Sequence, residues 1–383
     1  MKKLNKKLPL RKVKLPTFSK TKKYYEQIDK NLIYSNNGPL VRQLKKSLAE
    51  KFNVDENYLT ITSNGTVSLK AILRAIIEKK LQMGQIHEKN FSDLYCVLPS
   101  FTFVASAMSI IESGLQPIFI DIEGDNGLIS PINVKCFLEK KIVDNDKIIA
   151  VMPVSPFGAK INKNQWVEFR NQYNIEIVYD EAWCFDSFND VSLSPSAISL
   201  HATKSFGCGE GGLIISKDTE ITNHCRKFIN FGFDNNKISQ IFGTNGKMSE
   251  YNAAVALANL DEWPNNKSNC MNLQKYYLKK IKAFANIKVM DGFNSSWVWG
   301  TLPIIINNCS NINDIILSAA EHNIEFRSWW KNGIHSFPSM KNFICDKLNN
   351  TFELTNKLVN IPFFPQMSKE EIDLVCEFLK KYD

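Results

Sequence analysis

The sequence predicts an α/β protein in which helices flank a mostly parallel sheet, followed by a smaller α+β domain. Short runs of almost continuously apolar residues indicate strands that are buried on both faces of the sheet. Helical or loop segments separate most of these runs, and the pattern changes after Pro264. The apolar runs are residues 94–100, 117–122, 148–154, 175–180, 197–203 and 211–216.

The predicted α/β region opens with two helices. Residues 40–52 have apolar side chains at helical spacing, and residues 65–81 form a second helical segment that begins with small residues. The apolar runs then follow. A long helix over residues 247–263 ends the region, because the Pro-Asn-Asn stretch at Pro264 should interrupt it.

A different pattern follows Pro264. Residues 272–284 read as a helix, residues 297–306 as a strand, and residues 312–322 and 369–381 as helices. We therefore expect three parts, which are a basic N-terminal arm (1–25), a large α/β domain (26–263) and a small α+β domain (264–383).

Composition excludes several classes of protein. The chain has 383 residues, 44% of them apolar, which suffices for a large core. No apolar run approaches the roughly 18 residues of a membrane span, and the N-terminus lacks the apolar segment of a signal peptide. The nine cysteines are scattered without a CxxC pair, so we expect no metal site and no disulfide framework. Reduced thiols in a cytoplasmic protein are the simplest interpretation.

Positive charge is concentrated at the N-terminus. Residues 1–25 hold ten lysines and arginines and no acid, whereas the whole chain has a net charge of +8, so the remainder carries −2. We interpret this segment as a solvated, partly disordered arm. Contact with an anionic ligand, a nucleic acid or a membrane surface is the alternative. No aromatic residue precedes Phe18, so nucleic-acid binding is poorly supported.

Two reactive residue types stand at predicted strand ends. Asp180 ends the run 175–180, and Lys204 follows the run 197–203. Ligands of open α/β sheets bind at the carboxyl ends of the strands. Lys204 is either a surface residue before a flexible turn, or a lysine held in a pocket because its amine reacts. Four glycines behind it allow the tight turn that the second interpretation needs, and they are Gly207, Gly209, Gly211 and Gly212.

The same edge of the predicted sheet holds an anion site and aromatic residues. Gly65 and Thr66 open a helix whose free N–H groups suit a phosphate, although such a turn is also a common helix cap. Phe101 and Phe103 follow the first apolar run, where aromatic residues more often belong to the core.

A phosphate nest, an aromatic ring, a carboxylate and a lysine, in this order along the chain, match the needs of pyridoxal 5′-phosphate (PLP). The nest holds the phosphate and the aromatic ring stacks on the cofactor. The carboxylate pairs with the pyridine nitrogen, and the lysine binds the cofactor covalently.

The chain resembles the DegT/DnrJ/EryC1/StrS family of PLP-dependent nucleotide-sugar aminotransferases over nearly its whole length. "HATK…EGG" is the most specific of the matching segments. The segments that carry the resemblance are "NNGPLVRQLKKSLAEKF", "SNGTVSL", "LPSFTFVASA", "GLQPIFIDIE", "YDEAW", "SLHATKSFGCGEGG", "GTNGKMSEYNAAVA" and "IEFRSWWKNGIH".

This resemblance implies the aspartate aminotransferase fold type I, with a mostly parallel seven-stranded sheet, and PLP as the cofactor. It implies that Lys204 binds PLP and moves the proton, that Asp180 pairs with the pyridine nitrogen, and that Phe103 stacks on the ring. It also implies a homodimer, because Asn245 would reach the phosphate of the neighbouring subunit. The remaining phosphate-binding residues implied are Gly65, Thr66, Val67 and Ser199.

The chain departs from the family pattern at two positions. Where the family has Gln or His in contact with the cofactor, this chain has Trp183, which either donates a hydrogen bond to the cofactor or turns into the core. Ser155 stands where the family commonly has His, which would alter the fit of the substrate.

Three further residues are considered for contact with cofactor or substrate. For His201, structural packing is favoured over contact with cofactor or substrate. Arg327 and His335 align loosely with the family's substrate-side residues.

The resemblance implies transfer of an amino group from an amino acid, by analogy L-glutamate, to the C4 keto group of a nucleotide-linked 4-keto-6-deoxyhexose, in the synthesis of polysaccharide or O-antigen sugars. One alternative is a PLP-dependent sugar dehydratase-like enzyme. A dehydratase subgroup has His in place of the lysine, so Lys204 favours amino transfer. Another alternative is a non-catalytic regulator that keeps the fold, against which Lys204 and Asp180 both argue.

Overall fold

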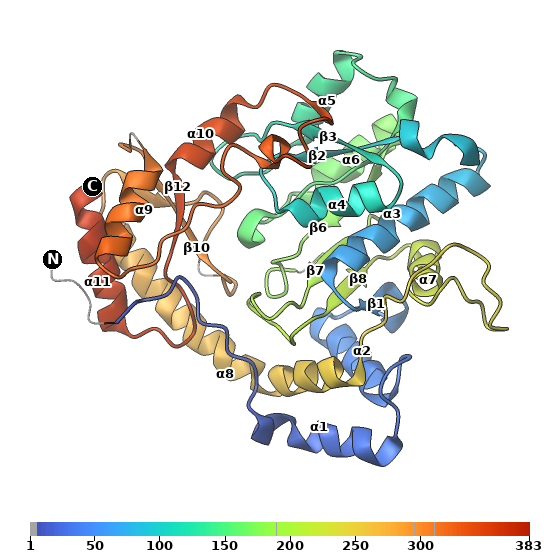
Figure 1. Cartoon of the computed structure of the whole chain (residues 1–383), viewed down its shortest axis with the longest axis horizontal. Coiled ribbons are helices and arrows are strands. Elements are labelled where there is room, and N and C mark those ends of the chain that lie inside the picture. Colours follow the sequence, from blue (N-terminus) through green and yellow to red (C-terminus); the bar gives the residue numbers. More distant parts are fainter. Residues whose placement is uncertain (1–5, 189, 295, 310) are drawn as a thin grey trace.

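The structure, a computed structural model, describes residues 6–188, 190–294, 296–309 and 311–383, with the backbone alone for residues 88–90. Its main sheet has the strand order β11-β3-β2-β4-β5, continued by β6-β7-β8-β1 (Figure 1). The strands of this sheet are β1 (Leu59–Thr62), β2 (Tyr95–Pro99), β3 (Gln116–Ile120), β4 (Ile148–Val151), β5 (Glu176–Ile177), β6 (Tyr179–Asp180), β7 (Ser196–Ser199), β8 (Gly212–Ile215) and β11 (Ile344–Cys345).

Strands β5 and β6 occupy one position in the sheet, because Val178 alone separates them. The amide of Val178 donates to the carbonyl of Val151 at 2.9 Å, and the amide of Asp180 donates to the carbonyl of Pro153 at 3.0 Å. Both acceptors belong to β4 or to the residues directly after it, so β5 and β6 continue along the same neighbouring strand. Excluding β11, the described residues therefore form seven strand positions, of which only β8 runs opposite to the others. The predicted mostly parallel seven-stranded sheet is confirmed.

Helices cover both faces of this sheet (Figure 1). Along β2, Val97 faces the core beneath α5 and α6, whereas Cys96 and Leu98 face the core beneath α3 and α4. The helices are α1 (Phe18–Asn31), α2 (Pro39–Phe52), α3 (Gly65–Gln82), α4 (Val104–Glu112), α5 (Pro131–Glu139), α6 (Lys163–Tyr173), α7 (Thr219–Phe228), α8 (Glu250–Ile281), α9 (Ile312–Glu321), α10 (Asn349–Lys357) and α11 (Lys369–Leu379). None of the helices in the described ranges is long and apolar enough to cross a membrane.

A second, antiparallel sheet has the order β12-β10-β9. Its strands are β9 (Ile287–Val289), β10 (Leu302–Ile306) and β12 (Leu358–Ile361). The predicted strand 297–306 is therefore wrong over its first five residues. Gln274 explains the difference, because its amide nitrogen donates to the Trp297 carbonyl at 2.7 Å and its oxygen accepts from the Trp299 amide at 3.3 Å. The Gln274 side chain therefore forms the hydrogen bonds that these buried backbone groups would otherwise make with a neighbouring strand.

Helix α8 runs through Pro264, so the predicted interruption there is wrong. A proline inside a helix removes one hydrogen bond and costs about 3 kcal/mol. Packing on both sides offsets this cost, since Trp263 meets Phe185 and Phe206 edge-on, and Tyr277 is fully buried further along. We propose that the large domain (26–263) and the small domain (264–383) meet within this helix, with β11 returning to the large sheet.

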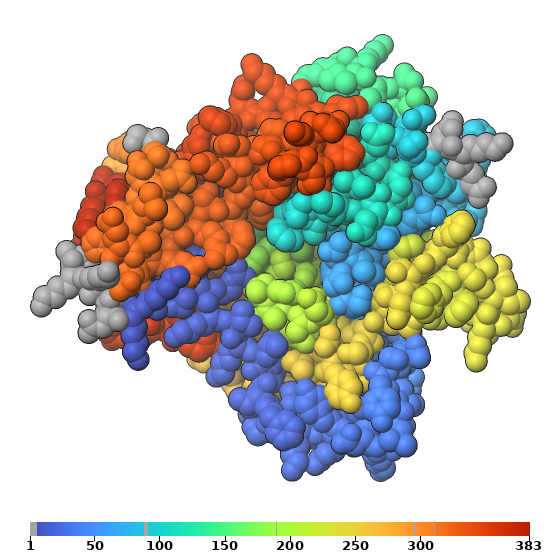
Figure 2. All heavy atoms as spheres, viewed as in Figure 1, coloured from blue at the N-terminus to red at the C-terminus, as the bar shows by residue number. Residues whose placement is uncertain are grey.

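Residues 6–16, here called the N-terminal strap, lie against the body of the protein (Figure 2). The amide of Leu8 donates to Asn323, the amide of Glu325 donates back to Leu8, and the amide of Phe363 donates to Leu10. Leu8 and Leu10 are buried, while Lys6, Lys7 and Lys12 before and after them are exposed. The expected disordered arm is therefore wrong for residues 6–16, because alternating leucines give this segment an apolar face. Residues 1–5 lie outside the described ranges.

Candidate active site

Strand ends and helix starts bring the predicted residues to one edge of the main sheet. Asp180 ends β6, Ser199 ends β7, and Gly65 opens α3 directly after β1. Lys204 lies in the hairpin that joins β7 to β8. The carboxyl ends of the parallel strands thus form the site, as the rule for open α/β sheets predicts.

The hairpin that carries Lys204 depends on glycine. A Cβ atom at Gly207 would lie 2.7 Å from the His201 carbonyl oxygen, and Gly209 has a φ of +94°, which other residues rarely adopt. Backbone hydrogen bonds from Ala202 to Gly209 and from Cys208 to Leu200 close the hairpin. The glycines therefore let the chain fold tightly behind Lys204, as predicted.

The amine of Lys204 sits in an electrostatically unusual place. Burial lowers its pKa to about 7; the charge of Arg11 adds to the decrease, and Asp180 opposes it. Its Nζ atom lies 3.8 Å from the centroid of the Trp183 ring. A large share of this amine is neutral near pH 7, and a neutral amine can attack a carbonyl group.

Asp180 is buried with two hydrogen-bond donors. The Ser106 hydroxyl donates to Oδ2 at 2.6 Å, and the Ala182 amide donates to Oδ1 at 3.2 Å. Burial raises the pKa of Asp180 despite these bonds. No lysine or arginine in the described ranges forms an ion pair with it. Ser106 was missed by the sequence analysis, although its place one turn after Phe103 in α4 is a usable signal.

The start of α3 offers two free backbone donors. The first turn of a helix leaves its N–H groups without helical partners. Asn64 caps one of them, accepting from the Val67 amide at 2.9 Å, and the Ser68 amide bonds to the Asn64 carbonyl. The amides of Gly65 and Thr66 have no partner among the described residues. The structure therefore favours these two amides over that of Val67 as anion donors.

Ser199 lies directly beside this helix start. A Cβ atom at Gly65 would come within 3.0 Å of the Ser199 side chain, so the two residues are in close contact. The Ser199 hydroxyl accepts from the His201 amide at 3.2 Å, and Ser199 is 7% exposed. This contact joins the start of α3 to the strand that leads to Lys204.

Phe101 and Phe103 have different environments. Phe101 is fully buried, whereas Phe103, at the N-cap of α4, is 56% exposed. The carbonyl of Phe103 accepts from the Ser106 amide at 3.1 Å, and Ser106 in turn contacts Asp180. The ring of Phe103 is therefore exposed, and its backbone is joined to the helix turn that contacts Asp180.

Trp183 faces the site and not the core. Its ring lies against the Lys204 amine and, at 5.3 Å, below the guanidinium of Arg11. Gly300 makes room for it, because a Cβ atom there would lie 2.4 Å from the indole. The alternative of a tryptophan turned into the core is not what the structure shows.

Ser155 and His201 have structural contacts. The Ser155 hydroxyl is buried, donating to the Ala159 carbonyl and lying 3.0 Å from the Cys184 sulfur. His201 Nδ1 bonds to the Thr203 hydroxyl at 2.8 Å and so braces the turn before Lys204.

The three remaining predicted residues, Arg327, His335 and Asn245, form no hydrogen bond or ion pair with Lys204 or Asp180 in the described ranges. Arg327 pairs with Glu325 at 2.7 Å, and His335 Nδ1 lies 2.8 Å from the Ser100 hydroxyl. Burial lowers the pKa of His335. Asn245 is exposed in the loop after α7, where it bridges to Asn230.

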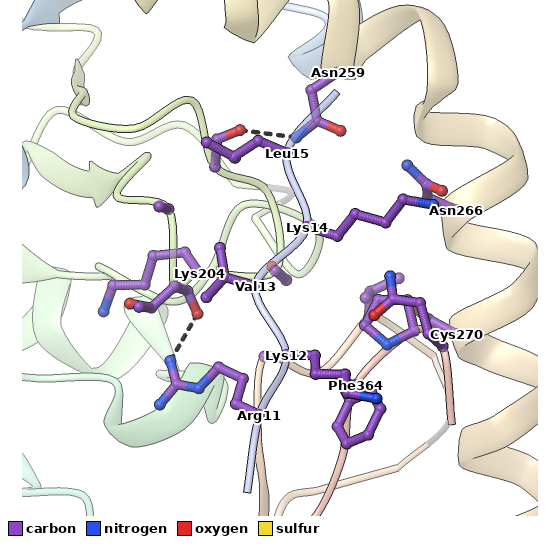
Figure 3. Close-up of a pocket in the computed structure, with 18 of the residues that line it drawn as sticks. Arg11, Lys12, Val13, Lys14, Leu15, Lys204, Asn259, Asn266, Cys270 and Phe364 are labelled. Carbon is purple, nitrogen blue, oxygen red and sulfur yellow. Dashed lines mark hydrogen bonds between the residues drawn. The ribbon is translucent and has the colours of Figure 1, made fainter. Parts of the chain in front are cut away.

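The sequence analysis missed Arg11, which the N-terminal strap brings to the Lys204 hairpin (Figure 3). Its guanidinium donates to the Thr203 carbonyl at 2.7 Å. No local signal distinguishes Arg11 from the nine other basic residues of the segment 1–25.

The residues present fit PLP. The buried Asp180 forms no ion pair in the described chain, two amides of α3 lack acceptors there, and Phe103 exposes its ring. Lys204 supplies an amine with a lowered pKa at the same edge. The fold and this site define the PLP-dependent enzymes of fold type I.

The chain belongs to the DegT/DnrJ/EryC1/StrS aminotransferase family, whose model matches residues 18–380. It is thus a PLP-dependent aminotransferase, which confirms the enzyme class and cofactor predicted from the sequence.

The chain is similar to several characterised proteins. It is 26% identical over 378 residues to the dTDP-4-amino-4,6-dideoxy-D-glucose transaminase of Shigella dysenteriae, covering 96% of each chain. It is 25% identical over 376 residues to the GDP-perosamine synthase of Escherichia coli O157:H7, covering 95% of each. The 3-oxo-glucose-6-phosphate:glutamate aminotransferase of Bacillus subtilis is 23% identical, with 89% of this chain and 75% of that protein covered.

Solved structures show the same fold. A proposed PLP-dependent aminotransferase of Bacillus cereus superposes with a TM-score of 0.86 at 25% identity, covering 98% of this chain and all of the other. DesI, crystallised with its TDP-sugar product, superposes with a TM-score of 0.83 at 22% identity, covering 100% of this chain and 94% of the other.

Proposed function

We propose that this enzyme transfers an amino group from L-glutamate to the C4 keto group of a nucleotide-linked 4-keto-6-deoxyhexose, in the cytoplasm, for polysaccharide or O-antigen synthesis. The observation that carries the proposal is the Lys204 amine, with a pKa lowered to about 7 beside a buried carboxylate. The relatives named for a 4-amino-4,6-dideoxy sugar support the position of amination, and the relative named for glutamate supports the donor.

Each residue of the site has a distinct task in this reaction. Bound PLP would supply an electron-accepting ring that stabilises negative charge on the carbon next to the amino group. With PLP bound, the Lys204 amine would hold the cofactor, and as a free amine it would act as the base that moves the proton of the carbon next to the amino group.

Asp180 would keep a proton on the ring nitrogen of PLP. Burial raises the pKa of Asp180 and so disfavours its charged form, but a cationic ring nitrogen would favour the carboxylate and give a charge-assisted hydrogen bond. Ser106 and the Ala182 amide orient the carboxylate for this contact.

Gly65, Thr66 and Ser199 would bind the phosphate, Val67 would lie beside them, and Phe103 would cover the ring. Trp183 would take the place of the family's Gln or His. Arg327 and His335 remain candidates for substrate contact.

A homodimer is part of the proposal. The loop between α7 and α8 protrudes from the body (Figure 1) and exposes three phenylalanines, including Phe242 at 87%. A soluble monomer rarely exposes such large side chains together. We propose that a second subunit covers this loop and that Asn245 reaches the phosphate of that subunit's cofactor.

The dehydratase-like alternative and the non-catalytic alternative both predict a different outcome in one assay. The purified protein, loaded with PLP, is offered L-glutamate and a panel of nucleotide-linked 3-keto and 4-keto sugars, and the products are identified by mass spectrometry. Our proposal expects an amino sugar from a 4-keto-6-deoxyhexose and none from the Lys204→Ala variant. A dehydrated sugar would support the first alternative, and no turnover of any sugar or of glutamate would support the second.

A further inference from the structure

The N-terminal strap places Arg11 against the hairpin that carries Lys204. Besides its hydrogen bond to the Thr203 carbonyl, the guanidinium lies 5.3 Å from the centroid of Trp183 and 5.9 Å from that of Trp329. Figure 3 shows the Arg11 side chain directed from the strap towards the Lys204 hairpin. Two indole rings and one backbone carbonyl thus fix the position of this cation.

No anion in the described part of the chain compensates Arg11. The nearest acidic influence is Glu325, whose carboxylate already pairs with Arg327 at 2.7 Å and Lys7 at 3.5 Å and accepts from the Leu10 amide. Burial and the charge of Arg327 lower the pKa of Arg11 to about 10. Arg11 is half-buried, and a partly desolvated cation without a counter-ion is less stable than a paired one, so an arriving anion would stabilise it.

Further donors near Arg11 also lack partners. The indole nitrogen of Trp329 and the hydroxyl of Ser205, the residue after Lys204, are buried without a hydrogen bond. Both groups can donate a hydrogen bond to an oxygen atom. The surroundings of Arg11 therefore suit a ligand rich in acceptor oxygens.

The location selects a carboxylate over a phosphate. Arg11 and Lys204 lie over the same indole ring of Trp183, so an anion on Arg11 is close to the reacting amine. The carboxylate of an amino acid is one bond from its reacting carbon, whereas the diphosphate of a nucleotide sugar lies across the sugar ring from C4. The planar guanidinium also matches a carboxylate through two parallel hydrogen bonds.

We propose that Arg11, delivered by the N-terminal strap, binds a carboxylate of the amino-acid donor and so determines specificity for that donor. The inference rests on the proposed amino transfer. It gives the basic N-terminal segment a function in the active site, with an anionic ligand as its partner.

The test compares Arg11→Gln and Arg11→Lys with the wild type, all loaded with PLP. Lys14→Ala is the matched control, since Lys14 belongs to the same strap but points towards Asn266 and away from Lys204 (Figure 3). The probe is glutarate, a dicarboxylate that has no amino group and cannot react. Its binding is followed by tryptophan fluorescence, to which Trp183 and Trp329 should contribute because they flank Arg11.

We expect Arg11→Gln to weaken glutarate binding about tenfold to hundredfold, the usual effect of losing hydrogen bonds to a charged group. Arg11→Lys should restore part of the affinity, and Lys14→Ala should change it less than twofold. Binding of a nucleoside diphosphate should stay unchanged in all variants. Circular dichroism and thermal unfolding check that each variant is folded.

Three outcomes would overturn the inference. They are equal glutarate affinity of wild type and Arg11→Gln, a wild type that does not bind glutarate, and a loss of nucleoside diphosphate affinity in place of glutarate affinity. A failure of the proposed amino transfer gives a different result. In that case the wild type binds glutarate but converts neither L-glutamate nor a keto sugar.

Discussion

The lowered pKa of Lys204 leads to a quantitative prediction about its reactivity. Burial and Arg11 bring this pKa from 10.5 to about 7. At pH 7 about half of the Lys204 amines are then neutral, compared with roughly one in 3,000 for an ordinary lysine, a difference of about a thousandfold. Because only the neutral amine is a nucleophile, Lys204 should react at a pH where other lysines are still protonated.

Trace acetylation measures this difference on the cofactor-free protein. The protein is labelled with a small amount of isotopic acetic anhydride between pH 5 and 11, and the label on each lysine is read by peptide mass spectrometry. Lys204 should reach half of its maximal reactivity near pH 7, and Nα-acetyl-lysine added to the same solution serves as the reference for an unperturbed amine. If Lys204 titrates together with this reference compound, the account of its environment is wrong.

Three other predictions concern stability, the electron sink and the second subunit. Since the folded state lowers the pKa of Lys204, this group costs stability below pH 7 and the cost disappears as the pH rises towards 10.5. Lys204→Met should therefore stabilise the cofactor-free protein by about 2–4 kcal/mol at pH 6, measured by urea unfolding, with little gain at pH 10; a gain independent of pH would contradict this. Asp180→Asn should still bind PLP but react with L-glutamate roughly a hundredfold more slowly in single turnover, and a wild-type rate would exclude the electron-sink role. Mixing Lys204→Ala subunits with Asn245→Ala subunits should restore part of the activity if Asn245 serves the partner's site, whereas a monomer that is fully active at all dilutions would exclude shared sites.

The main sheet and its strand ends were predictable because each element has a strong local signal. The almost continuously apolar runs 94–100 and 148–154 are typical of buried strands, Asp180 ends such a run, and Lys204 directly follows another. Parallel strands then bring their carboxyl ends together whatever the loops do. The site therefore follows from topology and from two residue types.

The features that were missed depend on contacts between distant segments. The Leu8 and Leu10 side chains look like parts of a charged tail until the distant segments that pair with them, around Ile324 and Phe363, are known, and nothing nearby reveals that Arg11 meets Thr203. Pro264 gives a strong local signal for a break, but packing on both sides of it outweighs that signal.

The central claim is that Lys204 is the residue that holds PLP. Reduction of the PLP-loaded protein with borohydride fixes the cofactor to its amine, and peptide mass spectrometry then identifies the modified residue. Our account predicts that the cofactor is found on Lys204, with loss of the visible absorbance band that the loaded protein shows before reduction. Attachment to another lysine, or no covalent attachment at all, would contradict it.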